Sequence, residues 1–193
     1  QYLAGVEDTL SQIHNMGVDY LNKNNAADTG LALALGVEEV TPLDMAKAYS
    51  VFANNGKKVS VGGILKITND KNTVLWERKV ENTEQVLDPQ AAYLINNILS
   101  DNNARPANWT NLVIPNRTVA VKTGTSIDIV NNVKKPKDLW TIGYTPSLVT
   151  AVWAGNNKGN ISVLTADGIT NAASIWKAFM TKALENKPKE EFS

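Results

Sequence analysis

Residues 119–126, with the sequence Val-Ala-Val-Lys-Thr-Gly-Thr-Ser, combine a β-forming stretch with polar side chains that could bind a ligand. Their β-branched composition predicts a strand, whose side chains alternate between two faces, so Thr123 and Thr125 share one face. Gly124 lets another backbone or a ligand approach closely, and Lys122 adds a positive charge beside the two hydroxyls. Such a strand could bind an anionic, extended, peptide-like ligand.

The triplet Lys122-Thr123-Gly124 resembles the third motif of the penicillin-recognising serine transferases, whose motif set is S-x-x-K, S-x-N and K-T-G. Other segments resemble, in the same order, the C-terminal part of the transpeptidase domain of class A (bifunctional) penicillin-binding proteins. These segments are residues 33–36, 40–49, 52–56, 143–146, 152–156 and 175–180. The resemblance covers nearly the whole chain and is therefore more specific than one short motif.

In that family the nucleophilic serine and its lysine lie upstream of every segment found here. Residues 5–18 resemble the family segment that follows S-x-N. The resemblance thus implies that the N-terminal half of the domain, with S-x-x-K and S-x-N, is missing from this chain. We expect the chain alone to have no transpeptidase activity, and the missing half to be its partner.

Two short matches imitate the absent motifs, and we interpret both as structural because short motifs have high false-positive rates. Residues 100–102 (Ser-Asp-Asn) fit S-x-N but end a predicted helix and come too close before Lys122. Ser174 and Lys177 fit S-x-x-K but follow the K-T-G triplet, inside the predicted C-terminal helix. The single histidine, His14, is also interpreted as structural, since a Ser–His–Asp arrangement needs partners placed by the fold.

Composition is that of a folded protein with no sign of a polyanionic partner. The chain has 193 residues and 43% hydrophobic content, which can supply a core. Lys+Arg and Asp+Glu both number 19, so the net charge is zero and no nucleic-acid partner is indicated. There are no cysteines, and we expect no metal and no cofactor. No apolar run approaches the ~20 residues that span a bilayer, so we expect no membrane contact by this segment.

Capping residues and apolar spacing predict the helices. Besides one helix at residues 5–16, Thr41 begins a helix to about Asn54, which we expect to be largely buried. Asp88 begins another, and residues 171–184 form the last. The apolar side expected for the Asp88 helix consists of Ala91, Leu94, Ile95, Ile98 and Leu99. The inward side expected for the last helix consists of Ala172, Ile175, Trp176, Phe179 and Ala183.

Alternating apolar residues predict a hairpin across residues 59–78 and an antiparallel pair at residues 139–144 and 148–154. Residues 127–138 contain three lysines and are predicted to form a polar loop. Residues 187–193 form a charged tail that we expect to be frayed.

Helices and hairpins alternate without βαβ repeats, which favours an α+β architecture with antiparallel strands packed against helices. The resemblance implies a partial penicillin-binding-protein/serine β-lactamase-like fold. Of its five sheet strands the chain would keep the last three, with the K-T-G strand at the edge facing the cleft. We divide residues 1–193 into a helical part with a hairpin (1–117), the K-T-G strand with two further strands and the closing helix (118–186), and the tail (187–193).

The resemblance implies acyl transfer by a serine outside this chain, to peptidoglycan stem peptides or to β-lactams. Lys122 would provide positive potential near the substrate carboxylate, and the hydroxyls of Thr123 and Thr125 would hydrogen-bond it. Gly124 and Ser126 would complete the substrate-binding strand, although Ser126 could equally satisfy local backbone. The backbone N–H of Thr125 would form half of the oxyanion hole.

For the parent protein the resemblance implies an extracytoplasmic location, in the periplasm or on the outer face of the membrane. An N-terminal transmembrane helix outside this segment would anchor it. Two alternatives remain open from the residues alone. One is a non-catalytic binding or scaffold module, which a parent lacking S-x-x-K would indicate. The other is a related D,D-carboxypeptidase or β-lactamase-type serine hydrolase.

Overall fold

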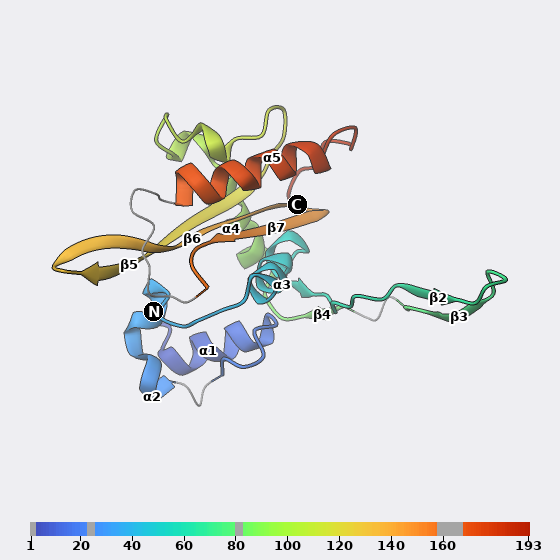
Figure 1. Cartoon of the computed structure of the whole chain (residues 1–193). Helices are drawn as coiled ribbons and strands as arrows, with labels where there is room; N and C mark the ends of the chain where they lie inside the picture. The colour runs from blue at the N-terminus through green and yellow to red at the C-terminus, as the bar shows by residue number, and fades with distance from the viewer. Residues whose placement is uncertain (1–2, 23–25, 80–82, 158–167) are drawn as a thin grey trace.

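The computed structural model describes residues 3–22, 26–79, 83–157 and 168–193. Figure 1 shows an antiparallel sheet with helices on both sides and a long hairpin that projects from the rest of the molecule. This arrangement agrees with the predicted α+β class.

Three strands form the main sheet in the order β5-β6-β7, and neighbouring strands run antiparallel. β5 spans Ala120–Val130, β6 spans Val133–Thr145 and β7 spans Leu148–Ala154. The two strands predicted before and after residues 145–147 are therefore present. β5, which contains the K-T-G triplet, is an edge strand within the described part of the chain.

The polar loop predicted for residues 127–138 is wrong, because most of this segment is β-structure. β5 and β6 continue beyond the body of the sheet as a hairpin that ends with Val130 opposite Val133 (Figure 1). Asn131 and Asn132 make the two-residue turn, with φ of 53° and 62°. Such turns require positive φ at both central residues, which Asn tolerates.

Helix α5 (Ala173–Ala183) covers one face of the sheet, together with the 3-10 turn η4 (Thr110–Leu112). Trp176 and Met180 are fully buried there against Val121 of β5. Buried residues in this half of the core also include Leu112, Ile114, Val119, Ala173 and Leu184. Ala172 and Trp176 face inward as expected, but Ile175 and Phe179 are more than half exposed, so the inward side was assigned about one residue off. A short π-helical turn, η5 (Gly168–Ala172), leads into α5.

Helices α3 (Pro42–Ala53) and α4 (Pro89–Ser100) lie on the other face. Tyr144 of β6 is fully buried between them and donates a hydrogen bond of 2.8 Å to the side-chain oxygen of Asn96. The expectation that the first of these helices is largely buried is wrong. Only Val51 and Ala53 in α3 are buried, whereas Pro42 and Leu43 are exposed and the other residues of the helix are half-buried.

Helix α4 shows the difference between an apolar side and a buried side. Ala92 and Asn96 face the interior, and the Asn96 side chain donates to the carbonyl of Phe52 at 2.9 Å. Leu94 and Ile98, which belong to the apolar side predicted from the spacing, are 60% and 65% exposed. The described part of the chain therefore leaves an apolar side of α4 uncovered.

The N-terminal helices form a third small cluster below α3 (Figure 1). They are α1 (Val6–Asn15), α2 (Ala26–Thr29) and the 3-10 helix η2 (Gly30–Leu35). The buried core of this cluster consists of Leu10 of α1 together with Val18 and Leu21 from the segment that follows α1. Gly17 follows the end of α1, with a φ of 106° that favours glycine.

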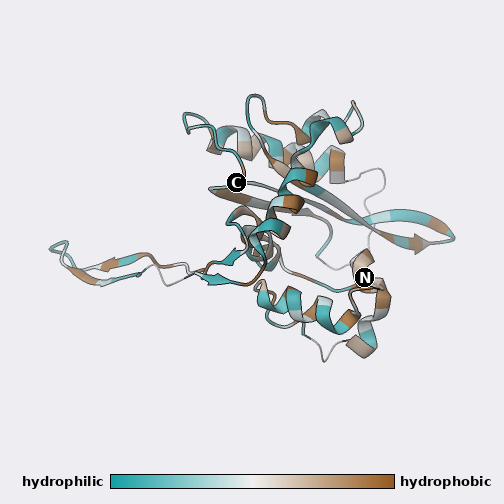
Figure 2. Ribbon diagram, turned by 180° about the vertical axis from the view of Figure 1, so that it is seen from behind, coloured by the Kyte–Doolittle hydropathy of each residue, from teal (hydrophilic) through white to brown (hydrophobic). Residues whose placement is uncertain are grey.

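The predicted hairpin at residues 59–78 is confirmed and forms the projecting arm. Its strands are β2 (Lys66–Thr68) and β3 (Val74–Glu77), and a smaller pair at its base is β1 (Lys57–Lys58) with β4 (Glu84–Gln85). Figure 2 shows hydrophobic and hydrophilic residues alternating along the arm. All residues of β2 and β3 are exposed.

The C-terminal tail is docked on the body, so the expectation of a frayed tail is wrong. Phe192 packs edge-on against Tyr144, with ring centroids 5.6 Å apart. The Arg117 guanidinium donates to three carbonyls at the end of α5 and in the tail, including that of Leu184 at 2.7 Å. One half-buried aromatic ring and one arginine that donates to three carbonyls thus hold a segment whose composition alone suggests mobility.

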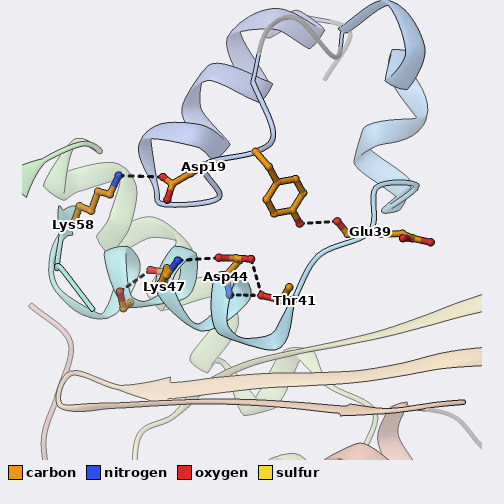
Figure 3. Close-up of polar contacts among 8 residues, drawn as sticks. Asp19, Glu39, Thr41, Asp44, Lys47 and Lys58 are labelled. Carbon is orange, nitrogen blue, oxygen red and sulfur yellow. Dashed lines mark hydrogen bonds and ion pairs between the residues drawn. The ribbon is translucent and has the colours of Figure 1, made fainter. Parts of the chain in front are cut away.

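The N-cap of α3 carries a network that makes stability depend on pH. Thr41 accepts a hydrogen bond from the Asp44 N–H at 3.1 Å and donates one to the Asp44 carboxylate at 2.6 Å (Figure 3). Lys47 pairs with the same carboxylate at 2.9 Å. The Thr41 hydrogen bond, and then Lys47, hold the pKa of Asp44 below its usual value of 3.8. A carboxyl group whose pKa is lower in the folded state stabilises the fold at pH values above its unfolded pKa. This stabilisation is lost as the pH falls through the pKa of the folded state.

We therefore predict that Thr41→Val lowers the free energy of unfolding by about 0.5–2 kcal/mol at pH 7, as expected for loss of an N-cap. The difference from the wild type should shrink when the pH falls below the usual aspartate pKa. Urea unfolding at pH 7 and pH 3 measures both values. Thr181→Val, at an exposed position of α5, is the matched control. An equal loss at both pH values would show that the carboxylate is not involved.

Candidate functional site

The five residues assigned to the site lie consecutively on β5, at the exposed edge of the sheet. Val121 packs under α5, so Thr123 and Thr125 share that face by strand alternation, as predicted. Ala120 packs on the α3 side, which places Lys122 and Gly124 on that opposite face. The strand therefore presents its hydroxyls on one face and its ammonium group on the other.

Lys122 is exposed and donates a hydrogen bond to the carbonyl oxygen of Thr123 at 2.5 Å. Thr123 is half-buried opposite Thr141 of β6, and Thr125 is exposed opposite Leu139. A Cβ added at Gly124 would meet only the Cβ of Trp140, at 3.6 Å. Space at Gly124 is therefore open within this chain.

Ser126 has partners within the hairpin. Its hydroxyl donates to the Asp138 carboxylate at 2.6 Å and accepts from the Asp138 N–H at 3.0 Å. The other Asp138 oxygen accepts from the indole N–H of Trp153 at 3.1 Å. The strand register shifts between Thr125 and Ile127, so Ser126 sits in a β-bulge. Bulges re-aim side chains and often lie next to functional sites.

Asp138 and Trp153 are functional-site candidates that sequence reasoning missed. Asp138 was placed in a polar loop, and Trp153 was treated only as part of a family segment. The usable signal was the Asn131-Asn132 pair between two valines, which indicates a tight hairpin and fixes the register that brings Asp138 opposite Ser126.

A groove of about 710 Å³ begins where the K-T-G segment ends. One wall is the segment between η2 and α3, residues 36–42. The opposite wall comes from β5, β6 and β7, with Trp140 and Trp153 as neighbours across the β6–β7 pair. The groove is thus an extension of the β5 surface toward the N-terminal helices.

The two sequences that imitate the missing motifs have structural roles. Ser174 donates to the carbonyl of Thr170 at 2.6 Å and accepts from the Asn111 side chain at 3.2 Å. Lys177 donates to the carbonyl of Thr110 at 2.8 Å. These bonds tie α5 to the loop before β5. Ser100 lies at the end of α4 and donates weakly to the carbonyl of Asn97, at 3.4 Å.

Other candidate residues contribute to packing. Trp109 is half-buried against the core under α5. His14 is half-buried in the last turn of α1. Among the described residues no group of three or more His, Asp or Glu is arranged to hold a metal ion. None of the described helices has the length and apolar content needed to cross a bilayer.

Comparison with known proteins gives consistent matches along the chain. The family model "Penicillin binding protein transpeptidase domain" matches residues 7–181. "Penicillin-binding protein 1A" of Neisseria lactamica is 34% identical over 174 residues, which is 86% of this chain and 20% of that protein. "Penicillin-binding protein 2D" of Bacillus subtilis is 34% identical over 169 residues, 83% of this chain and 23% of that protein.

The solved structure of the PonA1 protein from Mycobacterium tuberculosis in complex with penicillin V has a similar fold. Its TM-score is 0.79 with 26% identity, over 98% of this chain and 53% of that chain. The chain spans about a fifth of the length of the curated relatives it matches.

Proposed function

Because the chain belongs to the penicillin-binding protein transpeptidase domain family, we propose that it is part of a serine acyltransferase that cross-links peptidoglycan stem peptides. A serine outside this chain attacks the carbonyl before a terminal D-Ala, which leaves as the acyl-enzyme ester forms. An amine of a neighbouring stem peptide then resolves the ester. β-Lactams acylate the same serine. The observation that carries the proposal is Lys122-Thr123-Gly124 on an open edge strand, next to a groove.

The side chains of β5 have distinct roles in this proposal. The Lys122 ammonium group raises the positive potential near the substrate carboxylate and near the serine of the S-x-N motif. The hydroxyls of Thr123 and Thr125, on the other face of β5 from Lys122, hydrogen-bond the substrate carboxylate where it lies along the open edge of the strand, a charge-assisted contact that is stronger than a neutral one. Gly124 leaves room for the substrate backbone, and the backbone N–H of Thr125 provides half of the oxyanion hole.

Ser126, the other proposed substrate-binding residue, acts through the shape of the strand. Because its hydroxyl donates to the Asp138 carboxylate and accepts from the Asp138 N–H, it holds the bulge that follows Thr125 and orients the end of the strand toward the substrate. No cofactor is needed for this chemistry. The parent is proposed to act outside the cytoplasm, anchored by a transmembrane helix in a part of the protein beyond this segment.

The proposal is tested first by intact mass after incubation with a fluorescent penicillin. We predict a stoichiometric adduct on the parent protein and no added mass on the 193-residue chain. Its only S-x-x-K match follows the K-T-G triplet, and both side chains are hydrogen-bonded to backbone carbonyls of Thr170 and Thr110. An adduct on the chain alone would contradict this, and peptide mapping would then identify Ser100, Ser126 or Ser174 as a nucleophile. A parent that is not acylated would overturn the transpeptidase assignment and favour a non-catalytic module.

A further inference from the structure

Asp138 lies at the point where the register of β5 against β6 changes. The shift on β5 lies between Thr125 and Ile127, and it leaves one residue of β5, Ser126, opposite two residues of β6. Asp138 is one of these two residues. A bulge of this kind bends the strand that carries the extra residue and re-aims the groups beside it. The way in which Asp138 is held therefore affects the local path of both strands.

The Asp138 carboxylate is the shared hydrogen-bond acceptor at this bulge. One oxygen accepts from the Ser126 hydroxyl at 2.6 Å, and the other accepts from the indole N–H of Trp153 at 3.1 Å. The Asp138 N–H donates back to the Ser126 hydroxyl oxygen at 3.0 Å, so a side chain satisfies this N–H where the regular ladder is interrupted. Ser126 belongs to β5, Asp138 to β6 and Trp153 to β7. One carboxylate thus joins all three strands of the sheet.

The residues next to the bulge are fixed by packing. Leu139, which follows Asp138, is fully buried and is the cross-strand partner of Thr125. The Trp153 ring lies over Gly155, where an added Cβ would be 2.6 Å from the ring. Asp138 therefore connects the partner of Thr125 to a ring that is itself held in place. Functional groups are oriented most closely when they are supported by hydrogen bonds on rigid elements of this kind.

We propose that Asp138 is a positioning residue of the cross-linking reaction, which acts through Ser126 to aim the Thr125 N–H at the developing oxyanion. The inference rests on the proposed function, in which this N–H is half of the oxyanion hole. In an antiparallel ladder, successive N–H groups point alternately toward the partner strand and away from it, so the strand path at residue 126 sets the direction of its neighbour. A misplacement of about 1 Å can cost about 10²-fold in rate.

The experiment separates the binding of penicillin from acylation, by rapid-mixing kinetics of the parent protein with a fluorescent penicillin. The dissociation constant of the noncovalent complex reports ground-state contacts, whereas the first-order rate constant of acylation reports those made only in the transition state. We expect Asp138→Ala to lower the rate constant by about 10–100-fold and to leave the dissociation constant within about twofold of wild type. An acylaminomethylboronic acid, which forms a tetrahedral adduct with the serine, should inhibit more weakly by a similar factor.

Ser126→Ala carries the same test in case Asp138→Ala folds poorly, because it removes the hydroxyl and leaves the bond between Asp138 and Trp153 in place. Since Asp138 acts through Ser126, the double variant should be acylated no more than about twofold slower than Ser126→Ala alone. Asp138→Asn keeps the size of the side chain and one acceptor oxygen, so it should recover part of the lost rate.

Asp101→Ala is the matched control. The Asp101 carboxylate also accepts a backbone N–H, that of Asn103 at 2.8 Å, but it caps the short turn after α4. Losing this local contact should leave both kinetic constants within about twofold of wild type.

A wild-type acylation rate constant in Asp138→Ala, or a loss of penicillin affinity alone, would overturn the positioning role and leave the proposed function intact. Additive effects of Asp138→Ala and Ser126→Ala would also overturn it, because Asp138 would then not act through the bulge. A wild-type parent that penicillin does not acylate would overturn the proposed function and the positioning role with it.

Discussion

Replacing Lys122 by alanine in the parent enzyme is expected to slow acylation by penicillin by about 10²–10³-fold, the usual cost of losing one preorganised electrostatic contact at an acyl-transfer site. The ammonium group lies at the exposed edge of β5, on the face that carries Gly124, and none of the other residues from 119 to 126 carries a charge. Removing the ammonium group removes the positive potential that attracts the carboxylate of the substrate or the β-lactam.

The same substitution should leave folding almost unchanged. The Lys122 side chain is exposed and its one hydrogen bond is to the adjacent carbonyl of Thr123, so the free energy of unfolding should change by less than about 0.5 kcal/mol. The acylation rate is measured by a time course with fluorescent penicillin, and stability by urea unfolding of the same samples. This combination separates a loss of chemistry from a loss of structure.

Lys134→Ala is the matched control, since Lys134 is an exposed lysine on the hairpin formed by β5 and β6. It should leave the acylation rate within about twofold, as is usual for a surface change away from the site. Lys122→Arg keeps the charge and should recover part of the lost rate. A Lys122→Ala enzyme that acylates at the wild-type rate would contradict the role assigned to this side chain.

The K-T-G strand could be predicted from the sequence because the features that indicate it lie within the strand itself. β-Branched composition indicated a strand, and alternation placed Thr123 and Thr125 on one face, as the structure has them. The family resemblance recognised from this triplet and its flanking segments is confirmed by the matches along the chain. The roles of the individual side chains stay predictions.

The groove could not be predicted, because its walls come from segments far apart in the sequence. Residues 36–42 meet Trp140 and Trp153 only after α3 has packed against the sheet. The hairpin beyond Ser126 was predicted as a loop for a different reason. Its three lysines suggested solvent exposure, but Lys134 is exposed whereas Lys135 and Lys137 are half-buried. Charged residues are also compatible with strands when the backbone is paired across a tight turn.

Amphipathic spacing identified the helices correctly and assigned their inward sides less well. Leu94 and Ile98 of α4, and Ile175 and Phe179 of α5, have helical spacing and are exposed. Hydrophobicity indicates which side avoids water, whereas burial depends on what else is there to cover it.

Replacing Trp176 by alanine is expected to lower the free energy of unfolding by about 3–5 kcal/mol, the usual cost of removing a buried large aromatic side chain. Trp176 is fully buried and joins α5 to β5 and β6. Its indole ring lies directly over Gly143, where an added Cβ would be 2.4 Å from the ring. Such a loss is a large share of the about 5–15 kcal/mol that stabilises a typical domain.

Urea unfolding followed by circular dichroism measures this loss, with Phe179→Ala as the matched control. Phe179 lies three residues further along α5 and is 52% exposed, so its removal should cost much less. Equal losses in the two variants would mean that α5 packs on the sheet through a different side.

The contact between Trp176 and Gly143 can be tested on its own. Gly143→Ala alone should cost about 1–3 kcal/mol, because the new methyl group overlaps a buried ring that cannot move aside. In the Trp176→Ala background the same methyl group enters space that the indole has left, so its cost should vanish or become a gain. The double-mutant cycle should therefore show a coupling of at least about 1 kcal/mol, and strict additivity would contradict direct packing of the ring on the strand.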